Sequence, residues 1–388
     1  MINKCPVCGN KNIYQFFTLS DMPVYSNILY SSSDEAKKSI RGDIHLGYCK
    51  TCDLIFNTAF DEEKLDYNQT YENSLHFSPR FQTYARELAQ YLGNKYKLQN
   101  KTIIDIGCGK GDFLNMLCSY GNNRGIGFDP SIPDDYPTPS SQKEIVYVKD
   151  YFSPKYSNYL ADLICSRHTL EHVSDPIFFL KSVRETIKKS SQSIIFFEVP
   201  NMKYILEKGF VWDIIYEHVL YFTPNSLQNA FKLAGFKVHH VDETFERQFL
   251  TIEAILANAK TVELPTQSSE IISILEKFSD NYDKLITFWQ EKIERFGRDK
   301  LKAVIWGAGS KGITFLNTLQ IDDQINYVVD INPRKEGKYI AGSGQQIVSP
   351  DFLQKYKPDA VIVMNSIYIQ EIKEIIKKFD CDCQILVL

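Results

Sequence analysis

The chain has 388 residues, of which 44% are hydrophobic and 24% are charged, and its formal net charge at pH 7 is −4. This length allows two or three domains with their own cores, and the composition is that of an ordinary globular protein. The slightly acidic balance gives no broad attraction to nucleic acid or to an anionic membrane surface, so neither partner is expected.

The first residues of the chain do not form the charged-then-apolar pattern of a secretion signal, and no apolar run approaches the roughly 20 residues of a membrane helix. Nine cysteines, several of them in close pairs, favour reduced thiols that bind metal over disulfides in such a chain. We therefore expect a cytoplasmic protein, present as a monomer or a weak dimer.

Two cysteine pairs stand near the N-terminus, Cys5-Pro-Val-Cys8 and Cys49-Lys-Thr-Cys52. Each C-x2-C turn can present two thiolates to one ion, and two such turns complete a tetrahedral four-sulfur zinc site with no open position. A closed site of this kind is structural. We therefore expect residues 1–65 to form a small lobe around one structural zinc ion, bound by Cys5, Cys8, Cys49 and Cys52.

An apolar run, Thr102-Ile-Ile-Asp-Ile, leads into three glycines at alternate positions and then into a helical pattern. A strand, a glycine turn and a helix let the backbone approach a ligand closely. The next apolar run ends at Asp129, where an acidic residue can hold ribose hydroxyls. The two features together resemble the S-adenosylmethionine site of class I methyltransferases. The candidate cofactor residues are Asp105, Gly107, Gly109, Gly111, Asp129 and Asp150.

Residues 66–257 are expected to form this methyltransferase core, with an amphipathic helix over residues 79–92 ahead of its first strand. Strands are predicted over residues 102–106, 124–128, 145–148, 161–166, 193–199 and 249–256. Because helices alternate with these strands, we expect an α/β fold with a mostly parallel, Rossmann-like sheet that is covered on both faces.

Residues 258–299 are predicted to form a helical connector. Residues 300–388 are predicted to form a second Rossmann-like α/β domain. Apolar residues at spacings of three and four predict one long helix over 266–297. In the last domain, Gly307-Ala-Gly-Ser-Lys-Gly312 follows a strand, and Asp330 closes the next one. This is a formal dinucleotide fingerprint, so an NAD-linked oxidoreductase stays open as an alternative.

Two histidine motifs are candidates for proton transfer. His168-Thr-Leu-Glu-His172 matches a zinc-protease signature, but it directly follows a predicted strand instead of lying in a long helix, which argues against that class. His172 would instead lie at the carboxyl edge of the parallel sheet, where α/β proteins bind ligands. In Glu217-His218, a carboxylate stands beside a group that titrates near neutrality, although contact between adjacent side chains would need a turn.

The order of these parts resembles the nucleotide-sugar C-methyltransferase family of deoxysugar biosynthesis, over nearly the full chain. The most specific stretches are Trp306–Asn317, Tyr327–Gly337 and Pro358–Val363. The resemblance implies methylation of a thymidine-diphosphate 4-keto-deoxysugar on the carbon next to the ketone. It also implies a site composed of the base His218, its neighbour Glu217, a second histidine at His172 and a tyrosine at Tyr71.

The resemblance further implies that the last domain binds the nucleotide sugar, through Gly307, Gly309, Lys311 and Lys335. Two segments differ from the family pattern. Residues 243–250 replace a glycine-rich H-G-G-S-L-R segment, and Ala341-Gly-Ser replaces P-G-T. O- or N-methylation of a nucleotide sugar or a similar metabolite therefore stays open beside C-methylation.

Overall fold

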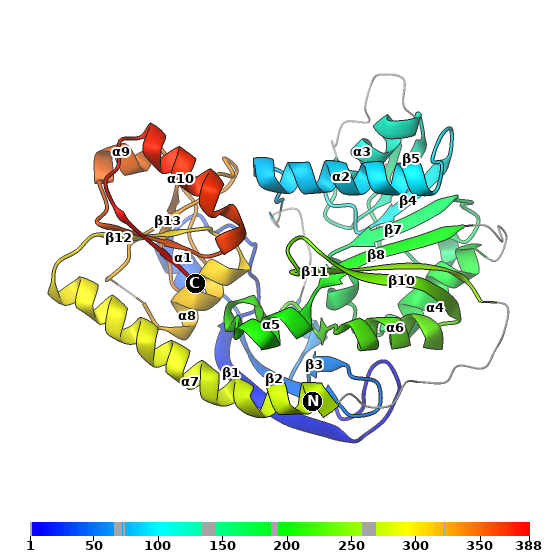
Figure 1. The fold of residues 1–388 in the computed structure, drawn as a ribbon, viewed down its shortest axis with the longest axis horizontal. Helices are drawn as coiled ribbons and strands as arrows, with labels where there is room; N and C mark the ends of the chain where they lie inside the picture. Colours follow the sequence, from blue (N-terminus) through cyan, green and yellow to red (C-terminus); the bar gives the residue numbers. More distant parts are fainter. Residues whose placement is uncertain are drawn as a thin grey trace.

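The computed structural model describes residues 2–65, 72, 74–133, 145–187, 193–257, 269–321 and 323–388. This part of the chain forms three sheets, of four, seven and five strands. Figure 1 shows the seven-stranded sheet on the right, the five-stranded sheet on the left and the N-terminal sheet below them. The predicted α/β architecture is confirmed for the two larger sheets, which contain the parallel strands.

The N-terminal sheet is antiparallel and is completed by a strand from the methyltransferase core. Its strands, in spatial order, are β1 (Ile13–Pro23), β2 (Arg41–Cys49), β3 (Ile55–Asn57) and β9 (Leu220–Tyr221), and the helix α1 (Ser33–Lys37) joins β1 to β2. Phe56 of β3 pairs with Leu220 of β9, and both side chains are fully buried. The N-terminal residues are therefore part of the core that positions residues 211–221.

The seven-stranded sheet has the order β10-β11-β8-β7-β4-β5-β6. Its strands are β4 (Thr102–Ile106), β5 (Arg124–Phe128), β6 (Ile145–Val148), β7 (Leu163–Arg167), β8 (Ile194–Pro200), β10 (Phe236–Thr244) and β11 (Phe249–Leu256). The five neighbouring strands β8, β7, β4, β5 and β6 are parallel. Strands β11 and β10 continue the sheet beyond β8 as an antiparallel edge. The predicted strands lie close to these bounds, and only β10 was missed. It is an edge strand with mostly exposed or half-buried residues, so it has no apolar run.

Helices cover both faces of this sheet (Figure 1). They are α2 (Pro79–Lys95), α3 (Asp112–Gly121), α4 (Pro176–Ile187), α5 (Met202–Lys208) and α6 (Pro224–Leu233). Local signals explain their starts: the Ser78 side chain caps α2 ahead of Pro79, and Thr223 forms a capping box with Ser226 ahead of Pro224. Phe81, Ala85, Leu88 and Leu92 form a buried face of α2, in agreement with the predicted amphipathic helix over 79–92.

The five-stranded sheet is parallel throughout and has the order β14-β13-β12-β15-β16. Its strands are β12 (Ala303–Trp306), β13 (Tyr327–Val329), β14 (Gln346–Val348), β15 (Ala360–Val363) and β16 (Gln384–Val387), and its helices are α8 (Ser310–Thr318), α9 (Phe352–Tyr356) and α10 (Ile369–Lys378). In both large sheets the first strand lies in the middle with later strands on either side, which is the doubly wound arrangement.

The helix α7 (Ser269–Arg298) runs from the N-terminal sheet to the last domain, close to the predicted helix over 266–297 (Figure 1). The ring of Phe278 packs edge-on against Phe17 of β1, with centroids 5.1 Å apart. Near its other end, Trp289 packs against Phe315 of α8 at 5.2 Å. In the part of the chain that is described, no helix is both long and apolar enough to cross a membrane.

Phe315 is fully buried between Trp289 and Trp212, whose ring lies 5.0 Å away, so it joins the last domain to the rest of the chain. We predict that Phe315→Ala lowers the free energy of unfolding by about 3–5 kcal/mol, measured by chemical denaturation. Phe288→Ala is the matched control, because Phe288 is 52% exposed and should cost at most about 0.5 kcal/mol. Equal effects of the two substitutions would contradict this account of the domain junction.

Candidate functional site

One cavity of about 880 Å3 is lined by residues from both doubly wound sheets. In each sheet the strand order reverses at a central strand: β5 and β6 lie on one side of β4 and β7 and β8 on the other, and β13 and β14 lie on one side of β12 and β15 and β16 on the other. Ligands bind at the carboxyl end of the strands at such a point. The cavity is lined there by the turn after β4 and by the turn after β12, so two candidate ligand sites share one space.

Two glycines of the turn after β4 occupy positions where a side chain does not fit. Gly107 and Gly111 both have φ of +72°, in the left-handed region that favours glycine. A Cβ atom on Gly107 would lie 1.9 Å from Oγ1 of Thr169, and one on Gly111 would lie 2.1 Å from the hydroxyl oxygen of Tyr147. Close packing against Thr169 and Tyr147 therefore requires these two glycines, whereas a Cβ atom on Gly109 would meet nothing within 4 Å.

The carboxylates that end β5 and β13 hold the two turns in the same way. Asp129 accepts from the N–H groups of Gly109 and Ser131, each at 2.8 Å. Asp330 accepts from the N–H groups of Ala308 and Asn332, also at 2.8 Å. Both carboxylates thus brace a glycine turn, and the binding of ribose by Asp129 stays a prediction.

Asp105 and Asp150 also line the cavity, in opposite environments. Asp105 is fully enclosed at the end of β4, and this burial raises its pKa to about 7 despite the nearby charge of Arg167. Asp150 accepts hydrogen bonds from the Tyr156 hydroxyl and the Lys155 ammonium group, which lower its pKa.

The predicted substrate residues Gly307, Gly309, Lys311 and Lys335 all line the cavity on the side of the last domain. The Lys311 ammonium group forms an ion pair with Asp213. Lys335 is buried, and its ammonium group donates to the carbonyl oxygen of Ala308 at 2.8 Å. Lys335 therefore supports the turn after β12, whereas Lys311 lies at the start of α8 with its charge balanced by a carboxylate.

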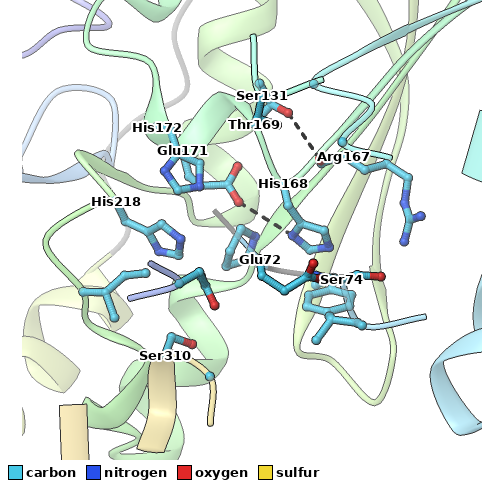
Figure 2. Close-up of a pocket in the computed structure, with 18 of the residues that line it drawn as sticks. Glu72, Ser74, Ser131, Arg167, His168, Thr169, Glu171, His172, His218 and Ser310 are labelled. Atoms are coloured by element: carbon cyan, nitrogen blue, oxygen red, sulfur yellow. Dashed lines mark hydrogen bonds and ion pairs between the residues drawn. The ribbon is translucent and has the colours of Figure 1, made fainter. Parts of the chain in front are cut away.

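His172 and His218 line the same cavity, with ring centroids 4.9 Å apart (Figure 2). Nδ1 of His172 lies 3.0 Å from the backbone carbonyl oxygen of Glu217. The buried Glu217 carboxylate accepts from the Ser26 N–H at 2.8 Å, toward the N-terminal sheet. Glu217 therefore positions His172 through its backbone. Tyr71 lies outside the described residues.

The environment of His218 keeps its imidazole ring neutral. Burial lowers the pKa of His218 well below its ordinary value, and the nearby charges of His172, His168 and Lys311 act in the same direction. A neutral imidazole has one ring nitrogen with a free electron pair, so it can accept a proton.

A second buried polar network beside the cavity was not predicted from the sequence. Glu198, at the end of β8, pairs with Arg167 at 2.7 Å and with His168 at 3.0 Å, and it accepts from the Tyr84 hydroxyl. Burial opposes its charge, yet Arg167 and these partners lower its pKa to about 2. Glu171 and Glu198 together raise the pKa of His168 to about 9, against the effect of burial. These side chains come from α2, β7, β8 and the loop after β7, so only the tertiary fold brings them together.

The four N-terminal cysteines lie together, as the sequence predicted for a metal site. The sulfur atoms of Cys5 and Cys52 are 3.4 Å apart, and those of Cys8 and Cys49 are 3.5 Å apart. All four sulfurs lie within 4.8 Å of one another, and none of these cysteines forms a disulfide. This set fits one tetrahedral ion with bonds of about 2.3 Å.

The turn after β4 yields a direct test of cofactor binding. We predict that Asp129→Ala weakens the binding of S-adenosylhomocysteine by about 1–3 kcal/mol in calorimetry, because a charged hydrogen-bond acceptor is lost. Asp330→Ala is a matched control that removes the equivalent carboxylate from the other turn. Unchanged affinity in the Asp129 variant, or equal losses in both, would contradict the assignment of this turn to the cofactor.

Comparison with known families places two domains on the chain. Residues 77–241 match the family described as "Methyltransferase domain", and residues 245–385 match the "C-methyltransferase C-terminal domain". The first match contains the turn after β4, and the second contains the turn after β12. The last domain is therefore similar to one found in C-methyltransferases.

Curated relatives cover the chain to different extents. The chain is 28% identical over 205 residues to tRNA U34 carboxymethyltransferase of Campylobacter jejuni, covering 49% of this chain and 64% of that protein. It is 21% identical over 409 residues to C-methyltransferase NovU of Streptomyces niveus, covering 97% of this chain and 93% of that protein. Among solved structures, it is similar to 1,6-didemethyltoxoflavin-N1-methyltransferase of Burkholderia thailandensis, with a TM-score of 0.35 and 13% identity, over 54% of this chain and 99% of that chain.

The fold, the glycine turn and the matched domains agree with one another. The doubly wound sheet has its glycine turn and strand-end acid where class I enzymes bind their methyl donor. Residues on both sides of that turn fall inside the matched methyltransferase domain. The chain therefore contains a methyltransferase domain with the class I fold, followed by a domain that matches the C-methyltransferase C-terminal domain.

Proposed function

We propose that the protein is a cytoplasmic C-methyltransferase that methylates a nucleotide-diphosphate 4-keto-deoxysugar, with His218 as the general base. The observation that carries this proposal is the shared cavity, in which His218 lies with the turn after β4 and the turn after β12. A methyl donor on the first turn and a nucleotide sugar on the second would meet at the histidines. The likeness to C-methyltransferase NovU over 97% of the chain supports carbon as the acceptor.

Carbon methylation requires that a proton leave the acceptor carbon. S-adenosylmethionine supplies an electrophilic methyl group on a sulfonium ion. His218, neutral and facing the cavity, can accept the proton that the neighbouring ketone acidifies. General base catalysis typically contributes about 10²–10⁴-fold, and fixed orientation of the reactants up to roughly 7–11 kcal/mol.

The rest of the cavity would hold the acceptor in place. The N–H groups at the start of α8 and the ammonium group of Lys311 are suited to a diphosphate, while Lys335 keeps the turn after β12 in shape. Glu217 fixes the ring of His172 through its carbonyl oxygen. We assign His172 to positioning beside the base, because its ring lies against that of His218.

We also propose that Cys5, Cys8, Cys49 and Cys52 hold one structural zinc ion. The second cysteine turn is hydrogen-bonded to α6, since the carbonyl oxygen of Cys52 accepts from the Asn229 side chain at 3.2 Å. The Asp53 carboxylate accepts from the Asn225 side chain at 2.9 Å. A closed zinc site would therefore help to fix α6, which follows His218 in the chain.

O- or N-methylation is the alternative that the same cavity allows, with His218 orienting a hydroxyl or amine. The exchange measurement below separates the two, because only carbon methylation requires loss of a carbon-bound proton. The NAD-linked alternative has less support, since the last domain matches one found in C-methyltransferases.

Zinc should be stoichiometric and structural. We predict at least one zinc ion per chain by elemental analysis of protein purified without chelators, and the loss of one equivalent in Cys49→Ser together with a lower melting temperature. Cys381→Ser is the control, because Cys381 is a half-buried free cysteine of the last domain. Wild-type protein without stoichiometric zinc would contradict the proposal.

The base is tested by exchange in heavy water. With an accepted 4-keto sugar, His218→Ala should lose both methyl transfer and solvent exchange of the proton next to the ketone, while the affinity for S-adenosylhomocysteine is kept. A fall of about 10²–10⁴-fold is expected from the loss of a general base. His240→Ala, in an exposed part of β10, is the control.

Two outcomes would overturn this assignment. Exchange that persists in the His218 variant but fails in His172→Ala would move the base to His172. Exchange that persists in both variants would leave the carbon-acid reaction without a histidine base and would favour the O-transfer alternative.

A further inference from the structure

Three side chains that line the cavity lie close enough together to hold a metal ion, a role that the methyl-transfer reaction does not require. Glu171, His172 and His218 each offer one ligand atom, and these atoms lie within 4.8 Å of one another. Figure 2 shows the three residues gathered on one side of the pocket. They are separate from the four cysteines, which lie on the N-terminal segment and use sulfur instead of nitrogen and oxygen.

The Glu171 side chain is the second observation that points to a ligand. Glu171 is only 1% exposed, and it lines the cavity. Its Oε1 lies 3.6 Å from Nδ1 of His168, whereas its buried Oε2 has no hydrogen-bond partner among the described residues. A buried carboxylate oxygen without a partner costs free energy unless a cation or a donor reaches it.

The orientation of the His172 ring also suits the binding of a metal ion. A carbonyl oxygen can only accept, so Nδ1 of His172 donates its hydrogen to Glu217, and Nε2 is the ring nitrogen that can coordinate an ion. Metal-binding histidines are commonly held in this way, with one ring nitrogen on a backbone carbonyl and the other on the ion. The partner of His172 is thus the outer contact that such a site needs.

The donor set defines the class of ion. Two imidazoles and one carboxylate form the three-ligand set of zinc hydrolase sites and of other sites for first-row divalent ions, with positions left for water or an acceptor oxygen. Imidazole nitrogen favours Zn²⁺, Co²⁺ and Ni²⁺ over Mg²⁺ and Ca²⁺, which prefer oxygen ligands.

We propose that Glu171, His172 and His218 form a second metal site, which binds one Zn²⁺, Co²⁺ or Ni²⁺ ion inside the cavity and switches methyl transfer off. The ion takes the electron pair of His218, so the ring cannot accept a proton while the ion is bound. The inhibition, though not the binding, rests on the proposed function. Removal of the ion restores the base.

The binding is tested with Co²⁺ on the full-length protein that retains its structural zinc. Co²⁺ in a histidine and carboxylate site gives weak visible absorption, whereas Co²⁺ that has replaced zinc on cysteines also gives intense sulfur-to-metal bands. We expect one equivalent of Co²⁺ without the sulfur bands. Glu171→Gln and His172→Ala should each weaken this binding by at least roughly 10–100-fold, the loss typical even of outer contacts to a metal ligand.

His240→Ala is the control for binding by an exposed histidine, and it should titrate like the wild type. Calorimetry with S-adenosylhomocysteine shows whether each variant is folded, since Glu171 and His172 lie outside the turn after β4. Absence of this one equivalent of Co²⁺ in the zinc-retaining wild type, or equal binding by wild type and by folded Glu171→Gln, would overturn the site.

Activity measurements distinguish a failure of the proposed metal site from a failure of the proposed function. Methyl transfer and proton exchange should both fall at least tenfold when Zn²⁺ saturates the site, and a mild chelator should restore them while the structural zinc stays bound. Saturation without inhibition would overturn the switch and leave the metal site standing. Metal binding by a protein that exchanges no carbon-bound proton under any condition would overturn the proposed base and leave the site intact.

Discussion

Two of the sheets in this chain have parallel strands at their centres, and this arrangement constrains the rest of the structure. The strands of such a sheet all end at the same edge, where the turns that follow them leave backbone N–H groups unpaired. Here the carboxylates of Asp129 and Asp330 each accept hydrogen bonds from two of these backbone N–H groups, in the same arrangement in both sheets. Residues of both turns line one cavity, so the chain presents the carboxyl edges of two sheets to a single space.

A shared cavity is useful only if its two sides hold their separation, because transfer between two bound molecules depends on orientation at the scale of an ångström. Several contacts fix this separation. Arg41 of β2 donates to the Asn317 side chain and to the carbonyl oxygen of Gly342, at 3.1 and 2.9 Å. Helix α7 packs against β1 at one end and against α8 at the other. The N-terminal sheet thus acts as a brace between the two larger sheets.

The sequence predicted what local signals determine. Apolar runs marked the central strands, and the spacing of glycines marked both turns, because such features depend on neighbouring residues alone. Strand β9 was not predicted, since two residues give no pattern and their pairing with β3 is a tertiary contact. The network around Glu198 was missed for the same reason.

Glu217 and His218 are adjacent in the sequence, but their side chains point to different parts of the molecule. The His218 ring faces the cavity, while the Glu217 carboxylate accepts from Ser26 of the N-terminal segment. Neighbours in sequence commonly point to different sides, so a shared role needs a contact that only the structure can supply. In this chain the contact runs instead from the Glu217 carbonyl oxygen to His172.

The central claim is that donor and acceptor meet in one cavity between two glycine turns. A crystal structure with S-adenosylhomocysteine and a nucleotide-diphosphate sugar tests it most directly. The account predicts the first ligand on the turn of Gly107–Gly111, the nucleotide on the turn of Gly307–Gly312, and the sugar beside His218. A nucleotide bound away from the second turn, or both ligands in separate cavities, would contradict it.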